Sequence, residues 1–539
     1  MAGWDEEFDL LCAGSGLGGC AAAVAGAEAG LKCLLLEKNP RVGGQTAWSQ
    51  GLVWVGNTGA APDDSPGDTR AYLDYLGAGR HDPEVTASFV ENAPRALRWF
   101  QQHGPLPLYA IEALPDHWFP LGAGSKPGGR THQVQPFEAK TLGEWRARLE
   151  FTPYGHGRVT FEEMAAWGGR AGYRNWDRNV IAQREKDDVR TFGAGLAGHA
   201  FKAVLDHGVA VQTETKASRL VIEDGRVTGL EVEAGGATRR IRAHKGVVLA
   251  TGDYNANQLL MSWWDEFSSW PPTGAPRNQG EGFVLANEKG AAFSIMHWKL
   301  VAQLGYSVPG EAVDGQPIAR TAGARELAYP HSVLVNRAGR RFADEAAFGD
   351  VTTNLRRFDA DSHRLVNVPC YFIFDSQYLR KYGLQPLTPG APPPAWLPRA
   401  ESLEELAAML EIDADRLCST VERFNGFVQK GADDDFHRGH IPWSNRAAGD
   451  SSQKNPNLGI ISEPPFFGIE LLTTGTSAVG LVTNGHGQVI HLRGHAIPGL
   501  YAVGDVAAGR HVGVGYQAGL SLAGAMTFGW LAAQHAAAS

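Results

Sequence analysis

A glycine-rich turn between two apolar segments is the feature that most constrains the fold of this chain. Residues 8–13 are apolar, and the turn that follows at residues 14–19 reads GSGLGG. An alanine-rich segment comes next, then a second apolar run at residues 31–36, and Glu37 ends the unit. This order predicts a strand, a tight turn, a helix and a second strand, which together form the unit that binds dinucleotides.

Each glycine of the turn has an expected role. Gly14 permits the sharp turn, Gly16 lets the backbone approach a pyrophosphate, and Gly19 lets the helix pack against the strand. Gly18 lies at the start of the helix, where free N–H groups and the positive end of the helix dipole favour a diphosphate. Glu37 is placed to accept hydrogen bonds from a ribose diol. We therefore expect this unit to bind a dinucleotide.

Two further segments are expected to contact the same ligand. Residues 38–56 combine glycines with small hydroxyl side chains, which leaves room for backbone to lie against a ligand. The contacts we expect from this segment are Lys38, Gly43, Gly44, Gln45, Thr46, Ser49 and Gly51. A short buried strand at residues 246–250 is followed directly by Thr251 and Gly252, whose backbone N–H groups should also reach the ligand.

Composition and charge exclude several classes of function. A chain of 539 residues suggests about two to four domains. The net charge of −9 and the pI near 6.1 argue against nucleic acid and anionic membranes as partners. The five cysteines have no CxxC spacing, so we expect neither disulfides nor a metal site. With no signal peptide and no apolar run near the ~20 residues that cross a bilayer, we expect a cytoplasmic protein.

The composition changes along the chain, which predicts an inserted domain. Residues 301–465 are richer in proline and charge and include a proline-rich linker at residues 386–398. Strand patterns typical of the first part return after this block. We therefore expect one domain formed by residues 1–300 and 466–539, interrupted by a second domain at residues 301–465.

The C-terminal segment indicates which dinucleotide is bound. Residues 499–506 read GLYAVGDV, so Gly504 and Asp505 follow a strand. A carboxylate at that place can bond a polyol, which a ribityl chain offers and nicotinamide cofactors lack. A helix predicted over residues 520–538 begins near Ser521 and Leu522 and would direct its N–H groups at the ligand. A flavin is the natural partner because its N1–C2=O edge becomes anionic on reduction.

These segments together resemble the FAD-dependent fumarate reductase/succinate dehydrogenase flavoprotein superfamily along nearly the whole chain. The segments that carry the resemblance are GSGLGG, Glu37, GGQTAWSQG at 43–51, ATGDY at 250–254, and GLYAVGD with GLSLAGAMTFG near the C-terminus. The resemblance implies an α/β fold: a split Rossmann-like FAD-binding domain with an inserted α+β cap domain for the substrate, and Ala217 among the FAD contacts. Succinate dehydrogenases attach FAD to a histidine where this chain has Gln45, so we expect noncovalent FAD.

Within this superfamily the chain is similar to 3-ketosteroid dehydrogenases and related cyclic-ketone dehydrogenases. Fumarate reductases carry a carboxylate-binding arginine in the C-terminal glycine loop, where this chain has Tyr516. In the ketosteroid enzymes a tyrosine O–H and a glycine N–H of this loop hold the substrate carbonyl, and we assign these roles to Tyr516 and Gly519. Two donors on the carbonyl oxygen would stabilise the enolate that forms as the α-proton leaves, before hydride is transferred to flavin N5. An external electron acceptor is then required, and the oligomeric state is left open.

The catalytic base and the substrate wall are less well defined by the resemblance. The ketosteroid enzymes use a tyrosine shortly after a GRRF-type turn as base, but this chain has phenylalanine and glycine at 348–349. Tyr173 is our first candidate for the base, with Tyr154 and Tyr329 behind it, and a structural role is the alternative for each. Trp118 stands near the place of another active-site tyrosine, so we expect an aromatic wall for a hydrophobic ring there. Further tryptophans that could add to this wall are Trp54, Trp263, Trp264 and Trp270.

Two other functions fit the same motifs. The first is an enoate or fumarate-type reductase in which Arg130, Arg174 or Arg277 supplies the positive charge that is absent from the usual places. The second is an FAD-bound protein without turnover that uses the cap as a binding module. The first requires an arginine at the flavin face, and the second requires a flavin face sealed by side chains.

Overall fold

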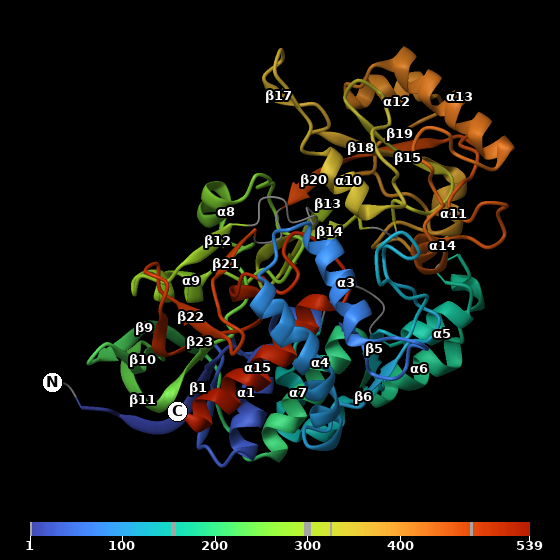
Figure 1. Ribbon diagram of the computed structural model, residues 1–539. Coiled ribbons are helices and arrows are strands. Elements are labelled where there is room, and N and C mark those ends of the chain that lie inside the picture. The colour runs from blue at the N-terminus through green and yellow to red at the C-terminus, as the bar shows by residue number, and fades with distance from the viewer. Residues whose placement is uncertain (1–2, 152–157, 170, 296–302, 324–325, 475–477) are drawn as a thin grey trace.

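A mixed sheet with a parallel centre, built from both ends of the chain, organises the first domain. The computed structural model describes residues 3–151, 158–169, 171–295, 303–323, 326–474 and 478–539 (Figure 1). The strand order is β22-β23-β11-β1-β2-β8, and β10 and β9 extend from β11 as a hairpin. The bounds of these strands are β1 Glu6–Ala13, β2 Cys33–Leu36, β8 Ala210–Gln212, β9 Thr215–Glu223, β10 Arg226–Ala234, β11 Ala237–Leu249, β22 Gln488–Ile490 and β23 Ala496–Ala502.

Strand β1 lies at the centre of this sheet, and its two faces enter two different cores. It pairs in parallel with β2 and β11, with Leu10 opposite Cys33 and Leu11 opposite Val247. Leu10 and Cys12 pack into the core on the helical face, whereas Leu11 packs into the core on the other face. Both faces are apolar because a strand covered on both sides has no solvent-facing residues.

Helices from the two chain ends cover one face of the sheet side by side (Figure 1). The helix α1, Leu17–Glu28, follows the glycine turn, and α15, Leu520–Ala538, ends the chain. A Cβ atom on Gly529 would lie 2.6 Å from the Gly18 carbonyl oxygen, so the close approach of the two helices requires glycine there. The same core receives α3 Pro66–Gly77, α4 Pro83–Gln102 and α7 Phe192–Asp206. The opposite face carries α8 Gln258–Trp264, α9 Glu281–Asn287, β12 Phe293–Ile295 and β21 Val479–Leu481.

The middle of the chain forms a separate cap around its own antiparallel sheet (Figure 1). The order of this sheet is β14-β13-β20-β18-β15, and β19 pairs with β20. Its elements are β13 Gln303–Val313, β14 Gln316–Thr321, β15 Ser332–Asn336, β18 Cys370–Asp375, β19 Arg399–Ala400 and β20 Phe466–Thr474, with α10 Phe348–Asn354, α11 Ser376–Lys381, α12 Leu403–Leu410, α13 Ala414–Lys430 and α14 Pro442–Ala448. The predicted α/β fold, a split domain with an inserted cap, is thus confirmed.

The domain boundary at residue 466 differs from the pairing that the structure shows. We expected residues 466–539 to return to the first domain, yet β20 pairs with β18 and β13 inside the cap sheet. The apolar pattern of β20 marks it as a buried strand, but its partners lie about a hundred or more residues earlier in the chain, which a local pattern cannot reveal.

A third, smaller group of elements lies beside the cap and supports one wall of the site (Figure 1). The three-stranded sheet β3-β5-β4 holds the loop between residues 110 and 131. The elements here are α2 Gly44–Trp48, β3 Val53–Trp54, β4 Leu108–Ala110, β5 Thr131–Val134, β6 Phe137–Glu138, α5 Phe161–Ala166, α6 Arg178–Asp187 and β7 Val189–Arg190. Remaining short elements are η1 Ala139–Arg148, η2 Tyr173–Asn175, η3 Gly504–Val506, β16 Phe358–Asp359 and β17 Arg364–Leu365.

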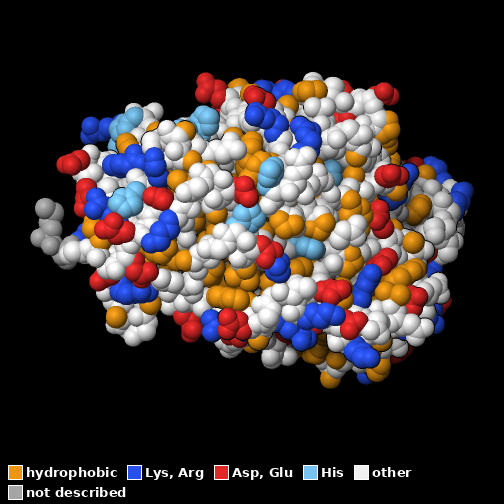
Figure 2. Space-filling model, turned by 90° about the horizontal axis from the view of Figure 1, so that it is seen from below, with side chains coloured by type: hydrophobic (Ala, Val, Ile, Leu, Met, Phe, Trp, Pro, Cys, Tyr) orange, Lys and Arg blue, Asp and Glu red, His pale blue; other side chains and the backbone are white. Residues whose placement is uncertain are grey.

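Figure 2 shows positive and negative side chains interspersed over the face of the molecule seen from below, without a broad basic area. Within the described ranges, no helix is both long and apolar enough to cross a membrane.

Candidate active site

A cavity of about 510 Å³ lies where the parallel strands end and the cap begins. The ends of four neighbouring strands contribute Ala13, Leu36, Ala250 and Val503, and the cap contributes Thr321, Gly323, Gln385 and Trp443. Ligands of open α/β sheets bind at this edge because the turns after the strands bring backbone N–H groups together there. The cavity therefore combines the predicted dinucleotide site with a second, cap-covered end.

Glu37 is held in a fixed position at one end of the cavity. Its Oε2 atom accepts hydrogen bonds from the Ser15 N–H at 3.1 Å and the Ser15 hydroxyl at 2.6 Å. Its Oε1 atom accepts two more from the backbone and side-chain N–H groups of Asn39, both at 2.9 Å. The first free N–H of helix α1, that of Leu17, donates to Thr46 Oγ1 at 2.9 Å. These contacts fix the turn around the helix N-terminus.

The glycines of the first turn have the steric roles expected of them. Gly14 has φ +112°, and a Cβ there would lie 2.2 Å from the Ala250 carbonyl oxygen. A Cβ on Gly19 would lie 1.9 Å from the Gly14 carbonyl oxygen, so Gly19 serves helix–strand packing and does not line the cavity. Gly43 also lies behind the cavity wall, where its N–H donates to Ser15 Oγ at 3.0 Å.

Most residues expected to contact the cofactor line this cavity. They are Gly14, Gly16, Gly18, Glu37, Lys38, Gly44, Gln45, Thr46, Ser49, Gly51, Ala217, Thr251, Gly252, Gly504, Asp505, Gly519, Ser521 and Leu522. They come from segments up to 500 residues apart, which the fold brings to one surface. Their contacts with a cofactor stay predictions.

Buried polar atoms along this cavity fit the presence of FAD. Within the part of the chain that the structure describes, six lining side chains carry a buried polar atom without a hydrogen-bond partner: His117 Nε2 and Trp443 Nε1 at the cap-covered end, and Thr251 Oγ1, Asn255 Oδ1, Asn278 Nδ2 and Glu281 Oε2 elsewhere. An unsatisfied buried polar group costs about 1–3 kcal/mol. A ligand rich in hydroxyl and phosphate oxygens would satisfy such atoms, and the glycine turn leaves space for its diphosphate.

The loop before helix α15 places Tyr516 at the cap-covered end of the cavity. Gly519 ends the loop with φ +93°, and a Cβ there would lie 2.7 Å from the Trp54 backbone nitrogen. The Trp54 N–H donates to the Gly519 carbonyl at 3.1 Å, which ties the loop to strand β3. Tyr516 is half-buried, and Gly519 begins the first turn of the helix.

Gln517 connects this loop to the neighbouring loop that carries His117. Its Oε1 atom accepts hydrogen bonds from the Tyr72 hydroxyl at 2.7 Å and from the His117 backbone N–H at 2.8 Å. Asp116 is buried and accepts from Trp54 Nε1 at 2.7 Å and from Arg130 Nη1 at 2.9 Å. The loop is thus anchored on both sides of His117.

Aromatic rings form the wall of the cap-covered end. The His117 ring lies 4.0 Å from the Trp443 ring and 5.2 Å from the Tyr516 ring, measured between centroids. Trp118 lies behind them, where it borders a gap of about 20 Å³ together with His117, Trp443, Tyr516 and Gly349. The expected aromatic wall thus includes two residues that we did not predict, His117 and Trp443. His117 adjoins Trp118 in a stretch whose aromatic content is a usable signal, whereas nothing in the sequence around Trp443 connects it to residues 117–118.

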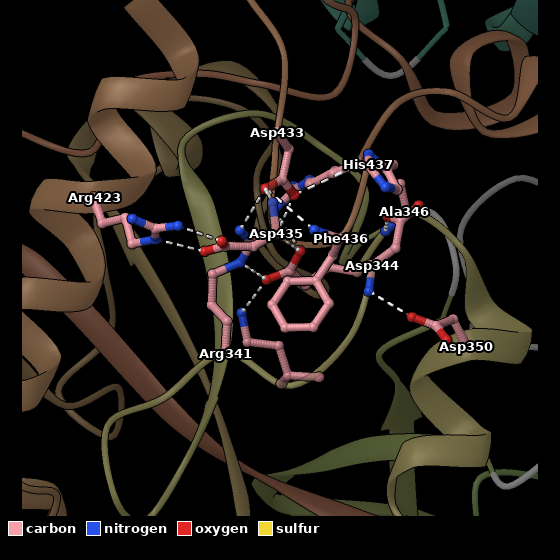
Figure 3. Close-up of polar contacts among 12 residues, drawn as sticks. Arg341, Asp344, Ala346, Asp350, Arg423, Asp433, Asp435, Phe436 and His437 are labelled. Carbon is pink, nitrogen blue, oxygen red and sulfur yellow. Dashed lines mark hydrogen bonds and ion pairs between the residues drawn. The ribbon is translucent and has the colours of Figure 1, made fainter.

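Buried ion pairs in the cap stabilise the segment that faces this wall. Arg341 donates to both oxygens of Glu345 at 2.7 Å and to Asp433 Oδ2 at 2.8 Å (Figure 3). Arg438 pairs with Glu345 at 3.3 Å. These groups are buried, so their mutual pairing is what makes their burial tolerable. The cluster holds the start of the segment that continues to Gly349.

Asp344 lies at the edge of this cluster. Its backbone N–H donates to Asp350 at 2.8 Å, and its Oδ1 atom accepts from the Ala346 N–H at 2.8 Å (Figure 3). Burial, together with the nearby Glu345 carboxylate, raises the pKa of Asp344 to about 7. The carboxyl is therefore close to half protonated at neutral pH.

The structure places Tyr173 and Tyr329 outside this wall. Tyr173 lies in η2, where its ring contacts Trp176 and the Arg178 guanidinium, and it is not among the described residues that line the cavity. Tyr329 is buried in the cap and stacks on Tyr382 at 4.6 Å. Tyr154 lies outside the described residues. The role of Tyr173 stays a prediction that this geometry does not support.

The other tryptophans and the arginines also lie away from the cavity lining. Trp54 is buried beneath Gly519, Trp264 packs on Tyr254, and Trp263 is exposed. Arg130 pairs with Asp64 and Asp116, Arg277 pairs with Glu150 and Asp314, and Arg174 lies beside Gly390. The cations among the described lining residues are Lys38 and Lys216, both near the Glu37 end.

Comparisons with known proteins agree with this site. The sequence profile of the family described as FAD binding domain matches residues 9–522. The chain is 31% identical to 4-oxocyclohexanecarboxylate 2-dehydrogenase of Sinomonas cyclohexanicum over 98% of this chain and 92% of the relative. It is 31% identical to 3-oxosteroid 1-dehydrogenase of Mycobacterium tuberculosis over 99% of this chain and 98% of the relative. The chain belongs to this family of FAD-binding proteins, so the predicted cofactor is confirmed as FAD.

A solved structure shows the same architecture. The crystal structure of 3-ketosteroid Δ1-dehydrogenase from Sterolibacterium denitrificans, in complex with 1,4-androstadiene-3,17-dione, has a TM-score of 0.90 and 29% identity. The similarity covers 99% of this chain and all of that one. The predicted resemblance to the ketosteroid dehydrogenase branch is therefore confirmed.

Proposed function

We propose that this protein is an FAD-dependent dehydrogenase that introduces a carbon–carbon double bond next to the carbonyl of a ring ketone, either a 3-oxosteroid or a smaller ring. The observation that carries the proposal is the position of Tyr516 and Gly519 at the aromatic end of the cavity that also contains the glycine turn and Asp505. The relatives at 31% identity are named for ring-ketone substrates of both sizes, which supports this class of substrate.

The chain's own residues bind and polarise the ketone. The Tyr516 O–H and the Gly519 N–H donate to the carbonyl oxygen, and they stabilise the negative charge that develops there when the α-proton leaves. Each such donor contributes about 3–4 kcal/mol to transition-state stabilisation. The rings of His117 and Trp443 pack on the apolar ring, and Trp118 behind them helps to exclude water. FAD, when bound, supplies the acceptor for the β-hydride.

Among its described residues, the aromatic end of the site lacks the positive charges that a dicarboxylate substrate requires. Recognition of a dicarboxylate such as fumarate requires cations, and the described residues at the aromatic end include none. Arg130 and Arg277 are already paired with carboxylates elsewhere. This arrangement speaks against the enoate-reductase alternative.

The cofactor is held without a covalent bond in this proposal. Gln45 stands where a histidine would form the link, and its Oε1 atom accepts the Ala275 N–H at 2.8 Å. Asp505 bonds the ribityl hydroxyls and Glu37 the ribose. An external electron acceptor completes the cycle, and the five free cysteines fit a reducing compartment such as the cytoplasm.

Anaerobic mixing tests the proposal. The purified holoenzyme is mixed with 4-oxocyclohexanecarboxylate, with 4-androstene-3,17-dione and with succinate, while flavin absorbance is recorded. We expect at least one of the ketones to bleach the flavin and succinate to leave it oxidised. Bleaching by succinate alone, or reoxidation of the reduced enzyme by fumarate alone, would refute the proposal.

A further inference from the structure

The position that holds the base in similar enzymes has no room for one here. Gly349 replaces the expected tyrosine, and a Cβ atom on Gly349 would lie 2.9 Å from the Trp118 ring. A larger side chain at this position would therefore require Trp118 to move. The indole fills the space from which a base on that segment would act, so the base must come from another element.

His117 has the features that a base requires. Its side chain lines both the main cavity and the gap beside Trp118. Its Nε2 atom is buried and has no hydrogen-bond partner among the described residues. Glu326 also lines the cavity, but its Oε2 atom accepts the Gly323 N–H at 3.1 Å. A buried imidazole nitrogen without a partner is unusual, since such atoms are nearly always satisfied by protein, water or ligand.

The geometry relative to Tyr516 suits removal of an α-proton. The α-carbon is bonded directly to the carbonyl carbon. If Tyr516 holds the carbonyl oxygen, the side chain that removes the α-proton must therefore be a direct neighbour of the Tyr516 ring. The two rings meet edge to face at 5.2 Å between centroids. A carbonyl held by the Tyr516 hydroxyl would present its α-hydrogens to the neighbouring imidazole.

We propose that His117 Nε2 is the base that removes the α-proton of the ring ketone. The inference rests on the function proposed above. In this step the α-C–H bond breaks, the proton forms a bond to Nε2, and the electron pair moves to the carbonyl oxygen held by Tyr516 and Gly519. The pair then returns to form the carbon–carbon double bond as the β-hydride leaves to FAD.

The surroundings of His117 keep the imidazole uncharged, and the same burial opposes its protonation unless a negative charge forms beside it. Burial lowers the pKa of His117 to about 3, so the ring is neutral at the pH of the cell. The nearby enolate, which forms at the same moment, stabilises the resulting imidazolium. The backbone of His117 is anchored through its N–H to Gln517, which holds the ring against Trp443. In the tautomer that the proposal requires, Nδ1 carries the proton of the neutral ring and Nε2 has the free lone pair.

Two variants and a matched control test the assignment without relying on turnover alone. His117→Ala removes the imidazole, and His117→Gln keeps a polar group of similar reach that is not a base. His199→Gln is the control: burial lowers its pKa also, to about 4, and its Nε2 contacts the Gln135 carbonyl away from the cavity. Each holoenzyme is reduced with dithionite and incubated anaerobically with a ring ketone in D2O. Deuterium entry at the α-carbon is followed by NMR, because this exchange needs the base but no hydride transfer.

The exchange rates and the FAD content of the variants together show whether His117 acts as the base. Both His117 variants should bind FAD normally but exchange α-protons about 10²–10⁴-fold more slowly than wild type, and added imidazole should restore exchange to His117→Ala. The His199→Gln enzyme should exchange like wild type. Exchange within about threefold of wild type in both His117 variants would overturn the assignment while leaving the proposed function intact. A wild-type enzyme that neither exchanges nor oxidises any ring ketone would instead overturn the function itself, and the base with it.

Discussion

Replacing Tyr516 by phenylalanine removes one hydroxyl and leaves the ring in place. The loop is fixed by the backbone conformation of Gly519, by the hydrogen bond from the Trp54 N–H and by the two hydrogen bonds that Gln517 accepts. None of these contacts involves the hydroxyl oxygen of Tyr516. The variant should therefore fold and bind FAD as the wild type does. Its effect should appear only when charge develops on the carbonyl oxygen.

The size of this effect follows from the number and setting of the donors. Loss of one oxyanion donor costs about 3–4 kcal/mol, and the Gly519 N–H remains to share the charge. Because Tyr516 is only half-buried, we take the lower part of this range. Each 1.36 kcal/mol changes a rate by a factor of about ten, so flavin reduction should slow by about a hundredfold.

Stopped-flow flavin reduction by a ring ketone, recorded anaerobically at saturating ketone, measures this rate. FAD content per chain serves as the check on folding. Tyr501→Phe is the matched control, since Tyr501 and its hydroxyl partner His535, at 2.8 Å, are not among the described lining residues, and loss of this hydroxyl should leave the rate unchanged. A Tyr516→Phe enzyme that reduces its flavin within about threefold of wild type would refute the role given to the hydroxyl.

Three further predictions concern stability and cofactor binding. Gln517→Leu should lower the free energy of unfolding, measured by denaturant melts, by about 3 kcal/mol. The Tyr72 hydroxyl and the His117 N–H, which donate to Gln517 in the wild type, would be left buried without an acceptor. Asp505→Ala should weaken FAD binding to the apoprotein by about 10–100-fold in a fluorescence titration, since hydrogen bonds to a charged group contribute about 1.5–3 kcal/mol, and an unchanged affinity would contradict its contact with the cofactor. Because the pKa of Asp344 is raised, the folded state keeps a proton between about pH 4 and pH 7 that the unfolded state has released. The free energy of unfolding should therefore fall as the pH rises through this window, and Asp344 should account for up to about 4 kcal/mol of the decrease. Asp344→Asn should flatten this dependence, and an identical pH profile would show that the group does not contribute.

The parts of the fold that depend on local pattern could be predicted from the sequence. The β1–α1–β2 unit is visible because its period, its glycine turn and Glu37 lie within about thirty residues, and α15 begins where the glycine loop ends. The hairpin of β9 and β10 is marked by its Asp224-Gly225 turn. Strand β13 is hard to recognise in the sequence because glycine and proline interrupt its alternation at Gly305 and Pro309.

In the site too, the residues that belong to local motifs could be predicted, and those brought together by tertiary packing could not. The lining by Gly16, Thr46 and Asp505 follows from motifs that a single segment carries. The positions of His117 and Trp443 do not, because their contact joins a loop between β4 and β5 to the first turn of a cap helix more than 300 residues later. No property of either segment alone encodes that contact; it is produced by packing of the cap against the third group of elements.

The proposed reaction removes one hydrogen from the α-carbon and one from the β-carbon of a ring ketone. A single anaerobic turnover tests it most directly: enzyme-bound FAD in slight excess over 4-oxocyclohexanecarboxylate or 4-androstene-3,17-dione, followed by mass spectrometry and NMR of the released compound. We expect one equivalent of reduced flavin and a product that lacks two hydrogen atoms, with the new double bond conjugated to the ketone. Recovery of both ketones unchanged, while fumarate reoxidises the reduced enzyme to give succinate, would contradict it.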